Sequence, residues 1–276
     1  MDAEGLGGPA DELHHGHGAN GQHLVEGLTG LQHFLQGLGD QTVAAIGSVV
    51  GHENQPVGNR LELVLQDDDV LAAETDVYKR QLPDRAALER AAAHMDFDAV
   101  IIDEAASTVY ISDPETRLDV GAVAKGWSAQ RAAEHAPEGL LISVGGNICA
   151  TGPKTEGGDP WVVGIQNPDG GDYLHTVCVT GGSVVTSGDY QRTYLVDGEY
   201  YHHIIDPETL MPSRYWRSVT VVCADSGIAD ALSTALFLMP QEEGQALLTR
   251  YNAEAMWVDA EGGEFFSPGF RELLRT

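Results

Sequence analysis

The chain has 276 residues, of which 42% are hydrophobic and 21% are charged, so it can bury the core of an ordinary globular domain. Its 42 acidic residues outnumber its 15 basic ones, and the net charge of −27 argues against a general nucleic-acid surface, since such surfaces carry basic patches. No run approaches the roughly 20 apolar residues of a membrane span, and residues 1–30 lack the basic and apolar regions of a signal peptide.

The first quarter of the chain differs from the rest. Residues 1–75 are rich in Gly, Leu, Gln and His, hold no helix or strand period for long, and include the cluster His14, His15 and His17. The next six residues, 76–81 (DVYKRQ), resemble the translation of a transposase adapter used in sequencing libraries. Our hypothesis is that residues 1–81 are a non-native or disordered segment left by sequence assembly, and that the genuine fragment is 82–276. A metal site at the histidine cluster is the alternative. Finding residues 1–81 in the uninterrupted gene would refute the assembly hypothesis.

The first elements after that segment are a helix and two short strands. Residues 84–94 are strong helix formers, and strands are expected at 99–103 and 108–111 around a polar turn. Residues 118–134 then read as a strand end, a glycine turn and a helix. Gly121 and Gly126 allow a ligand to approach the backbone, and Lys125 supplies a point charge, so the turn is a candidate phosphate cradle. Plain packing of a glycine-rich turn is the alternative, because the segment lacks the P-loop pattern.

Several β-rich segments follow. Residues 140–152 form a buried strand that Gly145 and Gly146 stop, with Asn147 at its end, and further strands are expected at 161–168 and 176–180. Residues 182–207 form a hairpin around Asp197-Gly198. A hydrophobic strand at 218–224 leads into a last helix. Strands and helices in this mixed order predict an α+β fold with mixed or antiparallel sheets.

The hairpin carries a group of polar side chains. Adjacent residues of a strand face opposite sides, so at most one of His202 and His203 works in a site. Asp206-Pro207 is also good turn chemistry, which is the alternative for Asp206. The polar residues on or beside the hairpin are Thr186, Ser187, Asp189, Arg192, His202, His203 and Asp206.

The last helix, at 227–239, places Asp230 and Thr234 four residues apart, on one face. A carboxylate above a hydroxyl suits a hard cation such as Mg²⁺. Two ordinary explanations compete with this one. An Asp near a helix start serves the helix dipole or a cap, and a helical Thr bonds back to its own backbone. The three cysteines, in apolar surroundings without CxxC spacing, favour buried free thiols: Cys149, Cys178 and Cys223.

Four stretches together resemble the FAD:protein FMN transferase (ApbE) family, in order and at the spacing of that family. They are 118–126 (LDVGAVAKG), 143–147 (SVGGN), 186–190 (TSGDY) with 201–207 (YHHIIDP), and 229–235 (ADALSTA). The resemblance covers about residues 82–276. It implies binding of FAD and Mg²⁺ and transfer of FMN to a threonine hydroxyl of a target protein, with release of AMP. It further implies targets among quinone reductase and Rnf-type electron-transfer subunits. The implied location is the bacterial cell envelope, on the outer face of the cytoplasmic membrane, with the full-length product a lipoprotein.

The resemblance also implies roles for individual residues. Mg²⁺ would be held by Asp230, Thr234 and the backbone carbonyl of Ala122. His203 would sit near the reacting phosphate as base or phosphate ligand, with Asp206 as its orienter or as the base itself. The residues expected along the FAD are Asp119, Lys125, Gly145, Gly146, Asn147, Thr186, Ser187 and Gly188.

Two departures from the family pattern stand out. Leu210 replaces the glycine of the family's Asp-Pro-x-Thr-Gly-x-Pro, although Pro212 is retained. In addition, residues 82–276 correspond to the C-terminal two-thirds of a family domain, and the N-terminal part of the family fold is expected to be missing. Two other functions share these residues: a Mg²⁺-dependent FAD pyrophosphatase that yields FMN and AMP, and a non-catalytic flavin-binding envelope protein.

Overall fold

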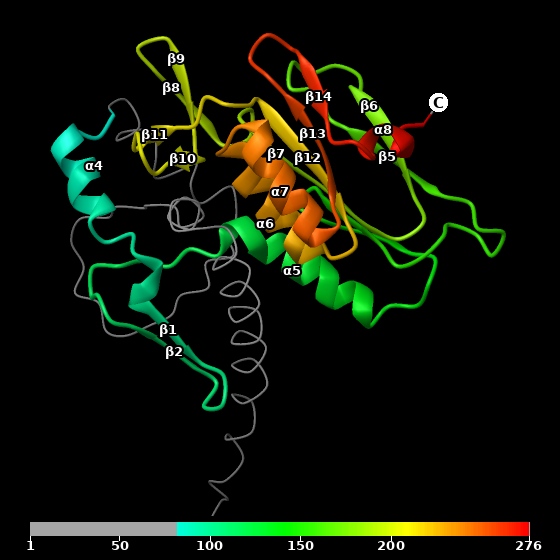
Figure 1. Cartoon of the computed structure of the whole chain (residues 1–276), viewed down its shortest axis with the longest axis horizontal. Coiled ribbons are helices and arrows are strands. Elements are labelled where there is room, and N and C mark those ends of the chain that lie inside the picture. The colour runs from blue at the N-terminus through cyan, green and yellow to red at the C-terminus, as the bar shows by residue number, and fades with distance from the viewer. Residues whose placement is uncertain (1–81, 276) are drawn as a thin grey trace, which may run out of the picture.

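The structure is a computed structural model that describes residues 82–275. At its centre lies a six-stranded antiparallel sheet in the order β14-β13-β12-β7-β4-β3 (Figure 1). Its two longest strands pair along their length, with Gly188 opposite Ser218 and Thr186 opposite Thr220. The strands are β3 (Leu141–Val144), β4 (Asn147–Ala150), β7 (Gly182–Gly188), β12 (Ser218–Cys223), β13 (Glu254–Val258) and β14 (Glu264–Phe266).

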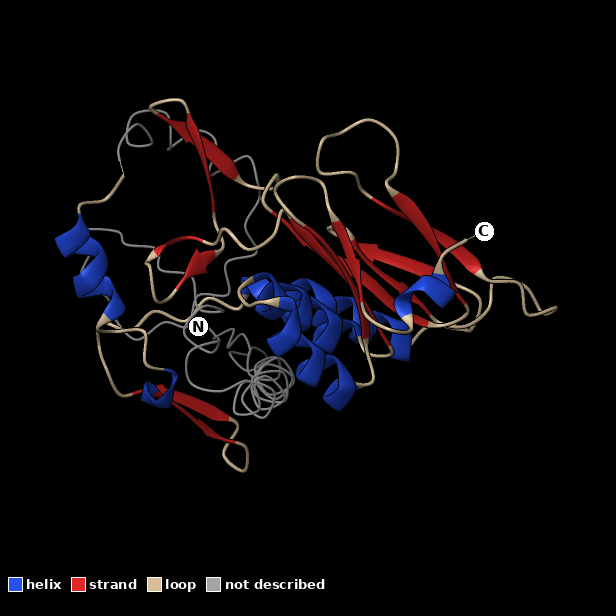
Figure 2. Ribbon diagram, turned by 45° about the horizontal axis from the view of Figure 1, so that its top comes forward, coloured by secondary structure: helices blue, strands red, loops and turns tan. Residues whose placement is uncertain are grey.

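Three helices cover one face of this sheet: α5 (Gly121–Glu134), α6 (Ser226–Phe237) and α7 (Gln241–Tyr251) (Figure 2). Helix α6 lies against β7 and β12 and also packs against α5. It is therefore buried almost throughout, and Leu232, Leu236 and Phe237 have no exposed surface. Apolar side chains of the sheet, such as Val185 and Val219, complete this core.

The other face of the sheet packs against a second hairpin and a short helix. The hairpin consists of β5 (Trp161–Ile165) and β6 (His175–Val179), and the helix is α8 (Phe270–Leu273). Val177 and Phe270 from these elements lie against Val184 and Met256 of the sheet. Successive residues of β7 thus point to opposite faces of the sheet: Val184 packs against the β5–β6 hairpin and α8, and Val185 packs against the helices.

Smaller elements lie beside this core. Figure 1 shows α4 and the β1–β2 hairpin on one side of it, with β8–β9 and β10–β11 near one end of the central strands. The bounds of these elements are α4 (Arg85–Ala92), η1 (Phe97–Ala99), β1 (Val100–Asp103), β2 (Thr108–Ile111), β8 (Thr193–Val196), β9 (Glu199–His202), β10 (Ile205–Asp206) and β11 (Met211–Pro212). No helix within residues 82–275 is long and apolar enough to cross a bilayer.

The predicted α+β class is confirmed, and so is the hairpin at Asp197-Gly198, where both residues have positive φ. Two local predictions are wrong. Gly145 and Gly146 do end β3 and form its turn into β4, but β3 is not buried as expected, because Leu141 is 37% exposed. No strand ends at Leu118, because the chain there runs directly into α5. The hypotheses about residues 1–81, including the histidine cluster and the adapter-like segment, lie outside the described residues.

Candidate functional site

A buried carboxylate lies in the middle of helix α6. Asp230 is 2% exposed and Thr234, one turn further along, is 9% exposed. Neither residue caps the helix, because the side chain of Asp225 does so by accepting a hydrogen bond from the N–H of Ile228 at 2.9 Å. The capping alternative for Asp230 is therefore wrong. The burial of this carboxylate therefore needs another explanation, since burying a charge costs free energy unless the charge is paired.

Helix α5 supplies one partner for this carboxylate. The N–H of Gly126 donates to Oδ2 of Asp230 at 2.8 Å. In a regular helix the same N–H bonds to the carbonyl of Ala122, so Asp230 competes with Ala122 for it. A Cβ at position 126 would lie 2.2 Å from the carbonyl oxygen of Ser226 and 2.5 Å from Cβ of Asp230. Only glycine lets the two helices approach this closely.

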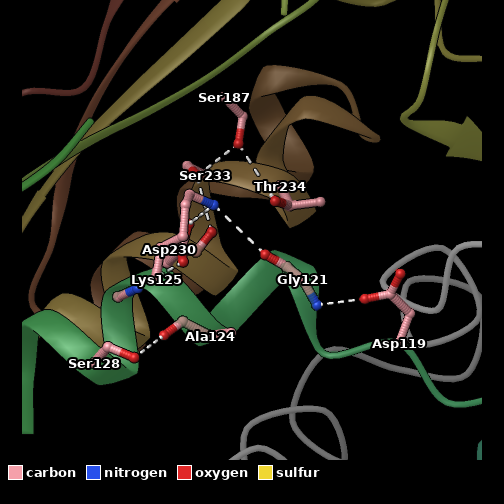
Figure 3. Close-up of polar contacts among 10 residues, drawn as sticks. Asp119, Gly121, Ala124, Lys125, Ser128, Ser187, Asp230, Ser233 and Thr234 are labelled. Carbon is pink, nitrogen blue, oxygen red and sulfur yellow. Dashed lines mark hydrogen bonds and ion pairs between the residues drawn. The ribbon is translucent and has the colours of Figure 1, made fainter. Parts of the chain in front are cut away.

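Lys125 supplies a second partner. Its Nζ lies 3.4 Å from Oδ1 of Asp230 and 3.5 Å from the carbonyl oxygen of Gly121 (Figure 3). The β3–β4 turn passes over this side chain, because a Cβ on Gly145 would lie 3.1 Å from Cδ of Lys125. Gly145 and Gly146 both have positive φ, which glycine adopts without strain. The structure thus brings together Asp230, Thr234, Lys125 and the glycine turn, four features that the sequence analysis placed in one site.

The electrostatic state of Asp230 reflects these neighbours. Burial raises the pKa of its carboxyl group, while Lys125, the Gly126 N–H and Asn147 lower it. Asn147 is 2% exposed and lies close enough to Asp230 to lower its pKa, but its Nδ2 forms no hydrogen bond of regular geometry within the described part of the chain. A buried carboxylate whose burial opposes its charge, beside a buried amide with an unused donor, suits a cation and an oxygen-rich ligand.

Hydroxyl groups surround Thr234. Ser187, on β7, has its Oγ 2.8 Å from Oγ of Ser233 and 3.3 Å from Oγ1 of Thr234 (Figure 3). Ser233 in turn donates to the carbonyl oxygen of Asp230 at 2.8 Å. Within the described part of the chain it is therefore the hydroxyl of Ser233, and not that of Thr234, that hydrogen-bonds back to the helix backbone.

The neighbours of Ser187 in the TSGDY motif do not share its contacts with α6. Thr186 faces the opposite side of the sheet, where its Oγ1 lies 2.8 Å from Oγ1 of Thr220. Gly188 ends β7 against the ring of Tyr190, since a Cβ there would lie 2.4 Å from that ring. Of the three residues expected along the FAD in this motif, the structure brings only Ser187 into contact with α6.

The start of α5 differs from the predicted phosphate cradle. Oδ1 of Asp119 accepts a hydrogen bond from the N–H of Gly121 at 2.7 Å, and the carbonyl of Val120 accepts from Val123 and Ala124. The N-cap position of α5 is Val120, and the side chain of Asp119 just before it is engaged by the N–H of the first helical residue, Gly121. Three N–H groups at this helix start already have partners, which leaves Lys125 as the stronger attraction for a phosphate here.

The two adjacent histidines have different surroundings, as predicted. His202 is buried, with its Nε2 2.9 Å from the carbonyl oxygen of Ser213 and its ring edge-on to Phe237. The side chain of His203 reaches the surface, but desolvation by the protein around it, followed by the charges of Arg192, His202 and Lys125, lowers the pKa of His203 to about 4. The imidazole of His203 is therefore neutral at physiological pH, and it is the histidine on the side of Lys125.

Asp206 lies in the turn after these histidines. Its Oδ1 accepts the N–H of Glu208 at 2.9 Å, and its carbonyl accepts the N–H of Leu210 at 2.8 Å. Between residues 82 and 275 no bond joins Asp206 to His203. Leu210 has a φ of 59°, in the left-handed region that glycine prefers, so this chain keeps the glycine-like backbone at the position where the family pattern has Gly.

Two groups that form part of this site were not predicted from the sequence. Ser233 gave no signal beyond its position three residues after Asp230, and the role of the Gly126 N–H depends on a contact between residues 104 apart. No three His, Cys, Asp or Glu side chains gather as a metal cluster in residues 82–275. The carboxylate of Asp230 is accompanied by the hydroxyl of Thr234, an arrangement that suits Mg²⁺, which is commonly bound through one or two carboxylates together with substrate phosphates.

Comparisons with known proteins place the chain in a family. The model of the ApbE family matches residues 35–257, a range that begins inside the segment 1–81. The FAD:protein FMN transferase of Treponema pallidum is 38% identical over 217 residues, which cover 71% of this chain and 59% of that protein. The enzyme of the same description from Klebsiella pneumoniae is 35% identical over 189 residues, which cover 66% of this chain and 58% of that protein.

Solved structures show the same fold. The ApbE protein of Thermotoga maritima superposes with a TM-score of 0.73 at 27% identity, over 94% of this chain and 79% of that one. The flavin transferase ApbE of Vibrio cholerae superposes with a TM-score of 0.65 at 25% identity, over 91% and 75%. The chain spans just under three fifths of the length of the two curated relatives.

Proposed function

Since this chain belongs to the ApbE family, we propose that it transfers the FMN half of FAD to a threonine hydroxyl of a target protein and releases AMP. The observation that carries this proposal is the buried carboxylate of Asp230. It lies between Lys125 and the closely packed Gly126, on the helix face that also carries Thr234. The carboxylate can hold a cation, and the ammonium group of Lys125 beside it can attract a pyrophosphate.

We propose that Mg²⁺ assists the reaction. Asp230, Thr234 and the carbonyl of Ala122 would hold the ion, and these are the oxygen donors that it prefers. The competition of Asp230 for the Gly126 N–H supports the third ligand, because it reduces the demand on the Ala122 carbonyl. When bound, the ion would neutralise charge on the pyrophosphate of FAD.

The residues around Asp230 have distinct parts in this proposal. Lys125 places its ammonium group at the same carboxylate, where it also attracts the phosphates of FAD. Gly145 lets the β3–β4 turn pack directly on Lys125, and Gly146 beside it leaves open space in which a ligand can approach the backbone. The buried amide of Asn147 offers an unused donor. FAD is thus proposed to lie along the β3–β4 turn and the start of α5.

The transfer requires one proton acceptor. A bond forms between the threonine oxygen of the target and the phosphorus of the FMN half. The bond from that phosphorus to the oxygen of AMP breaks, and AMP leaves with its electron pair. His203 is neutral at physiological pH and can take the hydroxyl proton. Asp206, three residues after His203, is proposed either to orient His203 or to act as the base itself.

The proposed partners are FAD and a target protein with an acceptor threonine, of the kind found in quinone reductase or Rnf-type electron-transfer subunits. The place that we propose is the outer face of the bacterial cytoplasmic membrane, with the full-length product attached as a lipoprotein. The proposed partners and the proposed location both rest on family membership, because the relatives of this chain are described as FAD:protein FMN transferases.

The experiment that tests the function is an incubation of the full chain with FAD, Mg²⁺ and a peptide that carries the acceptor threonine. Chromatography then separates the peptide, FAD, FMN and AMP. The proposal predicts one AMP for each flavinylated peptide. Free FMN and AMP with an unmodified peptide would identify a pyrophosphatase, and FAD that is bound but unchanged would identify a flavin-binding protein; either result refutes the transfer.

A further inference from the structure

Three hydroxyl groups connect β7 to the acidic residue of α6. Oγ of Ser187 lies 2.8 Å from Oγ of Ser233 and 3.3 Å from Oγ1 of Thr234. Ser233 has no exposed surface and Thr234 is 9% exposed. The contacts end at the carbonyl oxygen of Asp230, which lies 2.8 Å from Oγ of Ser233. We refer to Thr234, Ser187, Ser233 and this carbonyl as the hydroxyl chain.

The carbonyl fixes the direction of every proton in the hydroxyl chain. A carbonyl only accepts, so Ser233 donates its single proton to Asp230. Ser233 must then accept from Ser187 at 2.8 Å, which uses the single proton of Ser187. Ser187 can in turn only accept from Thr234. The proton of Thr234 therefore points toward β7.

We propose that Ser187 is a positioning residue that, through this arrangement, directs the oxygen lone pairs of Thr234 toward the divalent cation held beside Asp230. A hydroxyl with its proton directed to one side presents its lone pairs to the other sides, where a cation can bind. The inference rests on the proposed function, since it concerns the same cation. It also changes the expected part of Ser187, whose hydroxyl bonds to Ser233 and Thr234 of α6.

The test measures cation affinity on the full chain, with Mn²⁺ as the probe and the electron paramagnetic resonance of free Mn²⁺ as the readout. Loss of an outer partner of a metal ligand weakens metal binding about 10-fold to 100-fold. Ser187→Ala is expected to weaken Mn²⁺ binding by about tenfold or more on that basis. Ser187→Thr keeps the hydroxyl and is expected to restore binding to nearly the wild-type value.

Ser128→Ala is the matched control. Ser128 lies on the neighbouring helix α5 and donates to the carbonyl of Ala124 at 2.7 Å, a bond of the same kind that is not part of the hydroxyl chain (Figure 3). Its removal is expected to leave Mn²⁺ binding unchanged. Ser233→Ala removes the hydroxyl of α6 from the hydroxyl chain without cost in helix propensity. It replaces Ser187→Ala in the Mn²⁺ measurement if Ser187→Ala does not fold.

Each outcome separates the inference from the proposed function. Wild-type affinity in Ser187→Ala, or in Ser233→Ala if the first variant is unfolded, refutes the positioning role but leaves the cation site. Equal losses in Ser128→Ala and Ser187→Ala also refute it, because the effect is then general. A wild-type chain that does not bind Mn²⁺ refutes both the cation site and the inference. A loss in Ser187→Ala that Ser187→Thr reverses supports it.

Discussion

Replacing Gly126 with alanine tests the contact that places α5 against Asp230. A Cβ at this position would lie 2.2 Å from the carbonyl oxygen of Ser226, whereas ordinary contacts begin at 3.4 Å. The obstacle is backbone, which cannot rotate away, so α5 must shift by about 1 Å from α6, a change typical of overpacked cores. Such a shift also weakens the 2.8 Å bond from the Gly126 N–H to Asp230.

The magnitude follows from three contributions. Overpacking costs about 1–3 kcal/mol, and the weakened bond to a charged group adds about 1.5–3 kcal/mol if it is lost completely. The better helix propensity of alanine offsets about 1 kcal/mol. We therefore expect Gly126→Ala to lower the free energy of unfolding by about 2–4 kcal/mol, measured by urea denaturation monitored with circular dichroism.

Gly244→Ala provides the control, because Gly244 is also a buried helical glycine. The nearest atom to a Cβ there is Cδ2 of Leu236 at 2.6 Å, the end of a flexible side chain. Its cost is expected to fall within about 1 kcal/mol, since helix propensity offsets the adjustment of Leu236. A Gly126→Ala protein as stable as the wild type, or no less stable than Gly244→Ala, would contradict the close packing of α5 on α6.

Three further predictions concern charge and backbone. In the unfolded chain His203 takes up a proton near the usual histidine pKa, whereas in the folded protein its pKa is about 4. The contribution of His203 to stability should therefore fall as the pH falls from about 6.5 to 4. In urea titrations at several pH values the decline over this range should be smaller for His203→Gln than for the wild type, and an equal decline would exclude His203 as a source. Asp225→Ala should cost about 1 kcal/mol by removing the cap of α6, while Asp225→Asn should cost less; thermal unfolding that ranks them otherwise contradicts the cap. Asn252 ends α7 in the left-handed conformation, with φ 49°. Asn252→Ala should therefore lower the free energy of unfolding by about 1 kcal/mol, whereas Asn252→Gly should not. Equal melting temperatures for the two variants would contradict the left-handed conformation.

The helix that carries Asp230 illustrates what could be predicted from the sequence. The four-residue spacing placed Asp230 and Thr234 on one face, and the alternation along a strand separated His202 from His203, as the structure confirms. Both are local rules that depend only on backbone geometry. The same alternation also separates Thr186 from Ser187, although the motif resemblance assigned both to FAD.

The remaining features depend on contacts between distant parts of the chain. The bond from Gly126 to Asp230 joins residues 104 positions apart, and Ser187 meets Ser233 across 46 positions. No local pattern indicates such distances. That no strand ends at Leu118 has a local counterpart, the bond from the N–H of Gly121 to the side chain of Asp119, but the sequence there is compatible with both structures. The family match from residue 35 onward leaves the assembly hypothesis for residues 1–81 as a hypothesis.

The most direct measurement of the central claim is the intact mass of an acceptor peptide after incubation with FAD, Mg²⁺ and either the wild-type chain or Asp230→Asn. The variant keeps the size of the side chain but removes the buried charge that faces Lys125. The account predicts that the wild type adds one FMN to the acceptor threonine and that the variant, while still folded by circular dichroism, adds none within the same time. Flavinylation at the wild-type rate by Asp230→Asn would contradict the account, because the reaction would then not depend on this carboxylate.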